Sequence, residues 1–101
     1  MTISITTEGD KVIGQISGRL DTAAAAKFQQ DIQPLIEQAE KHIVLDCTAM
    51  EFISSSGLRI FLTLRKASMA KGGKVTIKGL SDEVRNVFTI TGFNSLFDFE
   101  E

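Results

Sequence analysis

The segment that decides the fold is residues 43–59, which read IVLDCTAMEFISSSGLR. Residues 43–45 form a continuous apolar run of the kind found in a strand that is buried on both faces. We expect this strand to end at Asp46 and a loop to follow over residues 47–54. A helix is then predicted from residue 54 or 55 to about residue 71, because apolar side chains cover most of its circumference. A buried strand that leads into a largely covered helix is typical of an α/β fold.

Two strands are predicted before this segment and two after it. Apolar and polar residues alternate over residues 1–7 and again over residues 12–17, which is the period of a half-buried strand. The turn over residues 8–10 is short enough to join these two strands as an antiparallel hairpin. Alternation over residues 74–78 predicts a further strand, and residues 96–99 are expected to form a last short one.

Two more helices are predicted outside the segment. The first begins at an Asp21 or Thr22 cap, and its apolar residues keep helical spacing over residues 28–39. Pro34 lies inside this helix, and because the apolar stripe continues across it we expect a kink in preference to a break into two pieces. The second helix begins at a Ser81 cap.

Strands that alternate with helices imply right-handed crossovers and a parallel sheet. We therefore predict an α/β fold with a mixed, mostly parallel sheet of four or five strands, an antiparallel N-terminal edge strand, and a cover of three or four helices. A chain of 101 residues is expected to form one domain, over residues 1–101. The residues expected to be almost fully buried in its core are Ile43, Val44, Leu45, Phe61 and Leu62.

The composition argues against several classes of function. A formal net charge of −2 provides no strongly basic footprint for nucleic acid, and no apolar run is long enough to span a membrane. Residues 1–4 lack the basic start of a signal peptide, so we expect a cytoplasmic protein. The single cysteine, Cys47, has no partner for an internal disulfide, and one cysteine with one histidine, His42, predicts neither a metal site nor a cofactor.

Three consecutive serines, Ser54, Ser55 and Ser56, stand at the predicted start of the covered helix. This is the carboxyl end of a parallel strand, where α/β proteins usually place their sites. Serine is a favoured N-cap, so one of the three is expected to cap the helix. The other two are candidates for modification or binding, since the free N–H groups and the positive end of the helix dipole stabilise a phosphate there.

No catalytic role is predicted for these serines. Ser-Ser-Ser-Gly is not the Gly-x-Ser-x-Gly nucleophile elbow, and the only possible base, His42, is expected at the far end of its strand. The chain has no Gly-x-x-x-x-Gly-Lys-Ser/Thr phosphate loop, and Cys47 is expected to be a small buried apolar residue. We therefore expect a protein that binds and does not catalyse.

The predicted loop also carries three large apolar residues, Met50, Phe52 and Ile53. At least one of them should fill the core. Any that stays exposed would form an apolar rim around the serines, and such a rim suits a protein partner.

Four elements of the sequence together resemble a known family. They are Gly18–Asp21, Val44–Asp46, Phe52–Arg59 and Phe88–Phe93. These elements are similar to those of the STAS domain, which sulfate transporters and bacterial anti-sigma factor antagonists share, and the resemblance spans almost the whole chain. The Ser-Ser-Gly-Leu element is the most specific of the four. The short chain without a membrane segment favours the stand-alone anti-sigma factor antagonist type.

The resemblance implies a partner-switching function. In that family the unphosphorylated antagonist binds an anti-sigma factor, a serine kinase that uses ATP, so that a sigma factor is released. Phosphorylation of the antagonist frees the kinase, and a PP2C-type phosphatase resets the antagonist. The phosphorylated residue directly precedes the glycine of the motif, which here puts it at Ser56, and Gly57 has no side chain to block access to that hydroxyl.

The residues expected to flank the phosphorylation site and bind the partner are Asp21, Ser54, Ser55, Gly57, Met50, Phe52 and Arg59. Antagonists often carry aspartate two residues before the acceptor, where this chain has Ser54. Two alternatives to the kinase-controlled switch therefore stay open. One is a docking subunit of a transporter or other signalling complex that is not phosphorylated. The other is a small-ligand or nucleotide-binding module that uses the same helix start.

Overall fold

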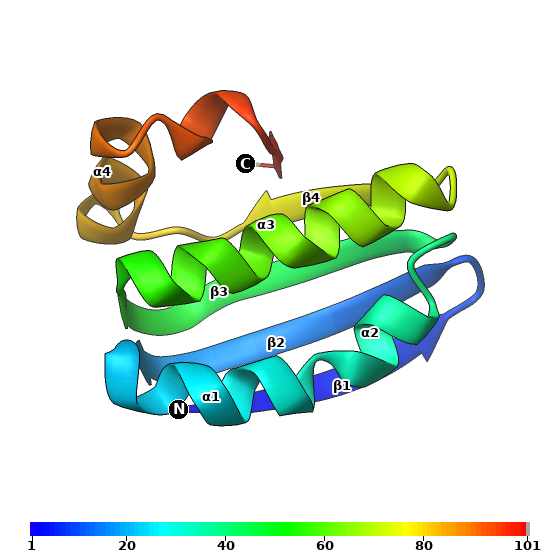
Figure 1. Ribbon diagram of the computed structural model, residues 1–101, viewed down its shortest axis with the longest axis horizontal. Helices are drawn as coiled ribbons and strands as arrows, with labels where there is room; N and C mark the ends of the chain where they lie inside the picture. Colours follow the sequence, from blue (N-terminus) through cyan, green and yellow to red (C-terminus); the bar gives the residue numbers. More distant parts are fainter. Residues whose placement is uncertain (101) are drawn as a thin grey trace.

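The computed structural model describes residues 1–100, which form a five-stranded sheet with helices (Figure 1). The strands lie in the order β1-β2-β3-β4-β5; β1 is antiparallel to β2, and every other neighbouring pair is parallel. The strands are β1 (Thr2–Glu8), β2 (Lys11–Leu20), β3 (His42–Ile53), β4 (Lys74–Lys78) and β5 (Asp98–Glu100). This arrangement confirms the predicted α/β fold with an antiparallel N-terminal edge strand.

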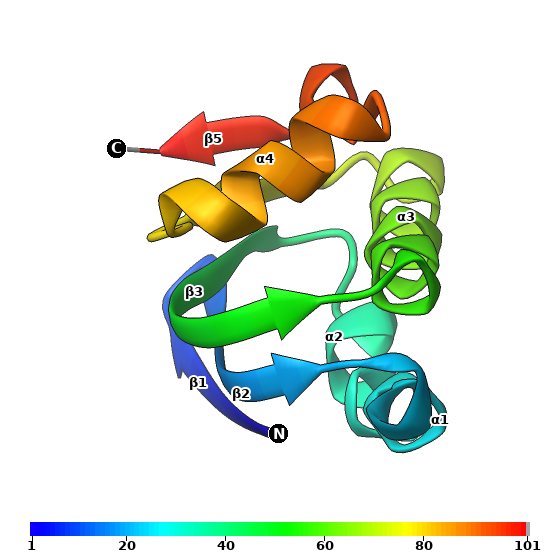
Figure 2. The same cartoon turned by 90° about the vertical axis from the view of Figure 1, so that its left-hand side faces the viewer.

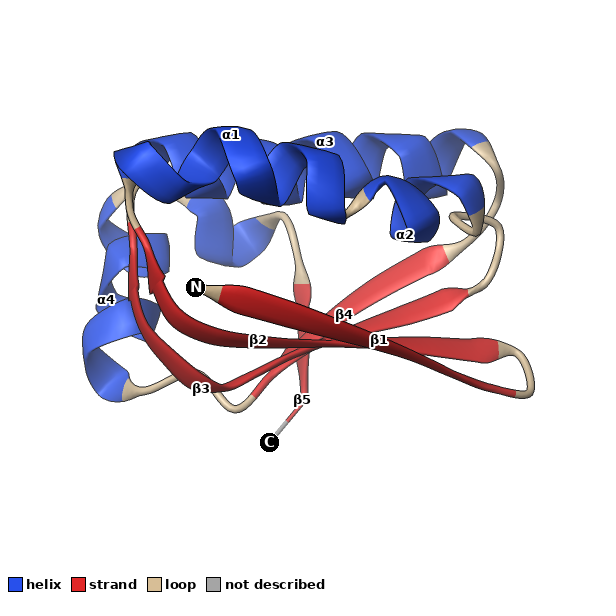
Figure 3. Cartoon of the chain, turned by 90° about the horizontal axis from the view of Figure 1, so that it is seen from below, coloured by secondary structure: helices blue, strands red, loops and turns tan. Residues whose placement is uncertain are grey.

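The helices are α1 (Thr22–Asp31), α2 (Gln33–Glu37), α3 (Ser55–Ala70) and α4 (Asp82–Ile90), followed by a short 3₁₀ turn, η1 (Phe93–Ser95). Figure 3 shows α1, α2 and α3 together on one face of the sheet, with α4 at its side. Within residues 1–100, no helix combines the length and the apolar character that crossing a membrane requires.

The first helical region is two helices, so the expected kink, which Pro34 would cause near Gln30, is wrong and the alternative, a break, is what occurs. Pro34 has no N–H to donate to the carbonyl one turn earlier, and its ring crowds that turn. Ile32 is the junction: it ends α1 and begins α2, with its N–H donating to the Phe28 carbonyl at 3.0 Å. The apolar stripe continues across the break as expected, because Phe28, Ile32 and Leu35 are all buried.

Strand β3 is much longer than expected, because residues 47–53 belong to the strand and not to a loop. Its pairing with β2 shifts register twice, between Gln15 and Ser17 and again between Gly18 and Arg19, and β3 carries the extra residue each time. Such bulges bend a strand without ending its pairing, and Figure 2 shows β3 curving as it approaches α3. The bulges also explain the missed strand: buried residues Cys47, Met50 and Ile53 recur every three positions, which hides the period of two.

The core lies between the sheet and α1–α3, and it is closed at one side by α4. Phe61 of α3 is at its centre, with its ring 5.9 to 6.4 Å from the rings of Phe28, Phe88 and Phe97. Ile43, Val44, Leu45 and Phe61 are almost fully buried, as predicted.

The expectation for Leu62 is wrong, because its side chain is only half-buried. Leu62 lies about 100° around α3 from Phe61, on the side that carries exposed Arg59 and Lys66. The other boundaries, including those of the last strand, Asp98–Glu100, agree with the expectations within two residues, except that β2 continues to Leu20, three residues beyond the predicted alternation.

Candidate functional site

The first turn of α3 carries the three serines, and each has a different environment. Ser54 has an extended backbone and is the N-cap, since its Oγ accepts a hydrogen bond from the Gly57 N–H at 3.2 Å. Ser55 is exposed and Ser56 is half-buried at the next two positions. Neither of their hydroxyls has a hydrogen bond to any of residues 1–100. Capping therefore uses one serine and leaves two hydroxyls free.

The start of α1 lies beside the start of α3, at the carboxyl ends of β2 and β3 (Figure 2). Asp21, one of the two predicted caps, is the N-cap of α1 and accepts a hydrogen bond from the Ala24 N–H at 2.9 Å. The Ser54 N–H donates to the Leu20 carbonyl at 2.9 Å, so the backbones that lead into the two helices are joined directly. The structure therefore brings Asp21 and the serines together at one edge of the sheet.

Gly57 has a packing role that the sequence did not suggest. It is buried, and a Cβ atom at this position would lie 2.8 Å from Cγ of Leu20 and 3.0 Å from Cγ1 of Ile53. A side chain at this position would therefore meet two residues of the core. Gly57 thus lets α3 approach β2 closely, which is a second reason for glycine here beside the access to the Ser56 hydroxyl that the sequence predicts.

The apolar rim around the serines is smaller than expected. Met50 is only 3% exposed and fills the core, so the prediction that it contacts a partner is wrong. The first bulge of β3 turns Met50 inward, opposite Gly18 of β2. Ile53 is buried as well, which leaves Phe52 as the half-exposed member of the three.

Arg19 is a residue of this edge that sequence reasoning missed. It pairs with Phe52 across β2 and β3, and its guanidinium carbon lies 4.5 Å from the centre of the Phe52 ring. This is a cation–π contact. Arg19 pairs with Phe52 only because of the second bulge of β3, and no local pattern in the sequence predicts that bulge. Arg59 is exposed on α3, one turn after Ser55, where it was expected to be available to a partner.

The electrostatics of the α3 start favour an added negative charge. No acidic residue lies in its first turn. The N–H groups of that turn have no partners within the helix apart from the cap, and the helix dipole places a partial positive charge there. The arrangement can therefore hold an anion attached to Ser55 or Ser56 without a basic side chain.

The groups that could support acid–base or thiol chemistry lie elsewhere. His42 begins β3, at the end opposite Ser54, and its Nε2 lies 2.8 Å from the hydroxyl of Thr76. Burial, reinforced by the charges of Lys74 and Lys11, lowers the pKa of His42. Burial also raises the pKa of Cys47 to about 12, so its thiol is not a reactive thiolate. Residues 1–100 contain no cluster of His, Cys, Asp and Glu that could hold a metal ion.

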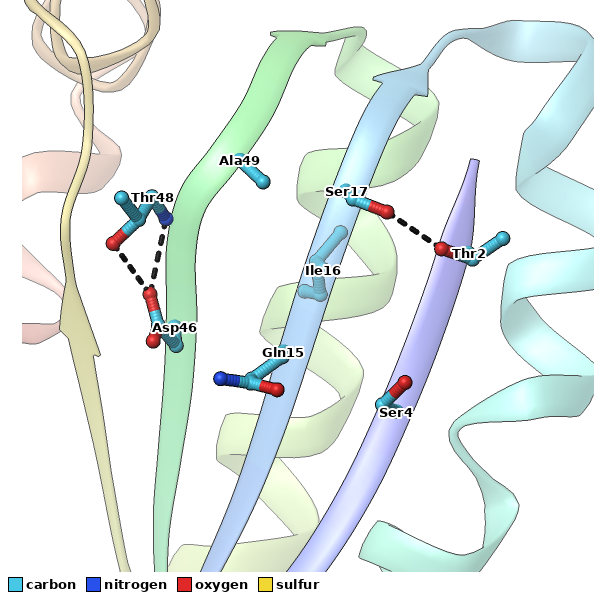
Figure 4. Close-up of a pocket in the computed structure, with 8 residues that line it drawn as sticks. All are labelled: Thr2, Ser4, Gln15, Ile16, Ser17, Asp46, Thr48 and Ala49. Atoms are coloured by element: carbon cyan, nitrogen blue, oxygen red, sulfur yellow. Dashed lines mark hydrogen bonds between the residues drawn. The ribbon is translucent and has the colours of Figure 1, made fainter.

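A shallow pocket of about 240 Å³ lies on the face of the sheet that α1–α3 leave open (Figure 4). It contains none of the predicted site residues. Asp46 lines it, and its Oδ1 accepts hydrogen bonds from the N–H of Thr48 at 3.0 Å and from its hydroxyl at 2.6 Å. Partial burial would raise the pKa of Asp46, but these bonds outweigh burial and the pKa is lowered. Asp46 thus stabilises the first bulge, and it is separated from Ser54 by the rest of β3.

Comparison with known proteins agrees with this architecture. The STAS domain family matches residues 2–101. BtrV of Bordetella bronchiseptica, named as a candidate anti-sigma factor antagonist, is 32% identical over 92 residues, which cover 87% of this chain and 79% of BtrV. The anti-sigma-B factor antagonist of Staphylococcus aureus (strain NCTC 8325) is 24% identical over 101 residues, which cover 100% of this chain and 94% of that protein.

Solved structures share the fold. A candidate anti-sigma factor antagonist from Thermotoga maritima superposes with a TM-score of 0.87 at 20% identity, covering 98% of this chain and 86% of that one. The anti-sigma factor antagonist SpoIIAA in its unphosphorylated form gives a TM-score of 0.73 at 20% identity, covering 99% and 88%. The family match and the BtrV similarity, both over most of the sequence, show that this chain belongs to the STAS domain family and is a distant homologue of anti-sigma factor antagonists.

Proposed function

We propose that this chain is an anti-sigma factor antagonist that is switched by phosphorylation of Ser56. One observation carries the proposal: Ser54 satisfies the cap of α3 and leaves the Ser55 and Ser56 hydroxyls free in the first turn, beside the backbone that leads to Asp21. Of the two, Ser56 is the one that directly precedes Gly57, the position of the acceptor in the family. A hydroxyl that has no structural hydrogen bond can be modified without removing a contact of the fold.

The partner proposed for the unphosphorylated chain is an anti-sigma factor, a serine kinase that uses ATP, so that binding releases a sigma factor. Two relatives are named as anti-sigma factor antagonists, one of them as a candidate, which supports an anti-sigma factor as the partner. Ser55, Phe52 and Arg59 are exposed or half-exposed around Ser56 and would line the contact. A PP2C-type phosphatase would remove the phosphate and restore binding.

A phosphate on Ser56 would act on the partner and not on the fold. It adds a charge of about −1.5 to −2 near neutral pH. The α3 start tolerates this charge, since no carboxylate occupies its first turn. In the complex the same group would bring a hydrated dianion into the interface next to Asp21. Placing it against a carboxylate or an apolar surface of the partner costs several kcal/mol, roughly tenfold in affinity for each 1.4 kcal/mol. Release therefore requires no large change of conformation.

The test is phosphopeptide mapping after incubation with the anti-sigma factor kinase encoded in the same genome and ATP. The expected product carries one phosphate, on Ser56. Ser55 is the matched control because it is adjacent and more exposed. Ser55→Ala should leave phosphorylation intact, and Ser56→Ala should abolish it. Phosphate on Ser55 would remove Ser56 from the mechanism.

The affinity of the same kinase for two variants tests the switch. Ser56→Ala should bind as the unmodified protein does, whatever the ATP concentration. Ser56→Asp should bind at least tenfold more weakly, a difference of about 1.4 kcal/mol. Unchanged affinity for Ser56→Asp, together with no phosphate transfer, would instead identify a docking module that is not phosphorylated.

A further inference from the structure

Arg19 and Phe52 form an exposed pair at the edge of the sheet that carries the serines. Arg19 is the last but one residue of β2 and Phe52 the last but one of β3, and they are paired across the two strands. The guanidinium carbon lies 4.5 Å from the centre of the ring. Arg19 is exposed and Phe52 is half-buried, so the pair faces solvent.

The guanidinium of Arg19 lies over the Phe52 ring but has no carboxylate partner among residues 1–100. Within residues 1–100 no carboxylate forms an ion pair with it, and its N–H groups donate no hydrogen bond. The contact with the ring holds the guanidinium in place and uses none of its N–H donors. A side chain that is already held in place loses less conformational entropy when it binds.

The pair also has a defined position relative to the two helix starts. One residue separates Arg19 from the Asp21 cap of α1, and one residue separates Phe52 from the Ser54 cap of α3. The hydrogen bond from the Ser54 N–H to the Leu20 carbonyl joins the ends of β2 and β3 directly after the pair. The pair therefore lies at the end of the sheet where α1 and α3 begin, within two residues of both caps.

We propose that Arg19, held by Phe52, is a preformed anchor for a carboxylate of the protein partner. The inference rests on the proposed function, and it adds the chemistry that the partner must present: an aspartate or glutamate placed to accept two N–H bonds from the guanidinium, beside an apolar group over the free part of the ring. Charge-assisted bidentate pairs are stronger than neutral hydrogen bonds, and arginine and aromatic residues are enriched at protein interfaces.

The chain offers a matched control for this anchor. Arg85 of α4 lies over the ring of Phe99 in β5, with its guanidinium carbon 5.4 Å from the ring centre. This second pair has the same chemistry and the same charge, but it belongs to the α4–β5 side of the molecule and not to the starts of α1 and α3. Removing either arginine changes the net charge equally, so a general electrostatic effect would act on both variants alike.

The experiment is isothermal titration of the anti-sigma factor kinase with the full chain and its variants, at two salt concentrations. Arg19→Ala should weaken binding at least tenfold, and Arg19→Lys should recover only part of that loss because an ammonium cannot form the bidentate pair. Phe52→Leu should weaken binding less than Arg19→Ala does, since it keeps the charge but removes the stacking. Arg85→Ala should bind within twofold of the unmodified protein.

Salt dependence gives a readout that a purely structural role would not change. The affinity of the unmodified protein should fall as salt rises, and Arg19→Ala should show a smaller fall because one charged contact is missing. Thermal unfolding of each variant checks that the fold is intact.

The outcomes separate this inference from the proposed function. If the unmodified chain does not bind the kinase, the proposed function and the anchor are both overturned. If the unmodified chain binds and Arg19→Ala stays within twofold, or Arg85→Ala loses as much as Arg19→Ala, the anchor alone is overturned and the proposed function stands.

Discussion

Helices α3 and α4 begin with the same type of capping hydrogen bond, but they differ in the charge of the first turn and in how that turn packs on the core. Ser54 Oγ accepts from the N–H of Gly57 at 3.2 Å, and Ser81 Oγ accepts from the N–H of Val84 at 3.2 Å. After the cap, α3 continues with two uncharged serines, whereas α4 continues with Asp82 and Glu83.

The third position after each cap differs as well. In α4 it is Val84, whose side chain is 1% exposed and fills the core. In α3 it is Gly57, where the Leu20 side chain occupies the space that a Cβ would need. Both helices begin with a serine cap, but they contact the core differently. Helix α4 does so with the Val84 side chain, and α3 does so with the backbone of Gly57.

The difference shows how a structural motif becomes a site. In α4 the carboxylates already complement the helix dipole, so its first turn is electrostatically complete. In α3 the dipole is left without a counter-charge, and free hydroxyls stand where one could be attached. A serine cap alone therefore does not indicate a functional site. The start of α3 is a candidate site because its first turn has no carboxylate to balance the helix dipole and because it lies beside the start of α1.

The largest effect should come from the side chain that anchors α4. Val84→Ala removes buried methyl groups and should lower the free energy of unfolding by about 2–3 kcal/mol. Urea denaturation measures it. A loss below about half a kcal/mol would mean that Val84 does not anchor α4 in the core, and the contrast with Gly57 of α3 would then be wrong.

The opposite change should destabilise α3. Gly57→Ala adds a single methyl group, which must displace Leu20 and Ile53. We expect a loss of about 1–3 kcal/mol from overpacking, although alanine is the better helix former by about 1 kcal/mol. Thermal and urea unfolding would detect it. A variant more stable than the parent would show that helix propensity outweighs the close packing and that Gly57 is not needed for the fold.

The two caps should be equivalent in stability. Ser54→Ala and Ser81→Ala each remove one capping bond of the same length, so each should cost about 1 kcal/mol of unfolding free energy. Urea denaturation of both variants in one buffer compares them directly. A difference above about 1 kcal/mol would mean that one serine has a further structural role.

The smallest effect should be the electrostatic one. Ser56→Asp supplies the charge that the α3 start lacks and should stabilise the fold by about 0.3–1 kcal/mol, while Glu83→Gln removes such a charge from α4 and should destabilise by a similar amount. Both changes should shrink as salt rises. Unfolding at low and high ionic strength measures them, and destabilisation by Ser56→Asp would argue against a fold that tolerates a phosphate there.

Several features of the site followed from short stretches of sequence. Capping needs only a serine or an aspartate and the few amides that follow it, so Asp21, Ser54 and Ser81 could be placed as caps or candidate caps from local pattern alone. The buried run at Ile43 to Leu45 and the alternation of the hairpin are likewise local. The apolar stripe after Asp21 was correctly predicted too, although the effect of Pro34 was underestimated, because a kink and a break share the same pattern.

The tertiary structure alone decided the features that depend on two segments at once. Two bulges in β3 arise from its pairing with β2, and they extend the strand to Ile53, turn Met50 inward and bring Phe52 under Arg19. The need for glycine at position 57 arises from Leu20, which lies more than thirty residues earlier in the chain. Periodicity and capping follow from interactions within a few residues, so the sequence determines them by itself. Register shifts and close approaches depend on which partner a segment meets, and only the folded chain brings those partners together.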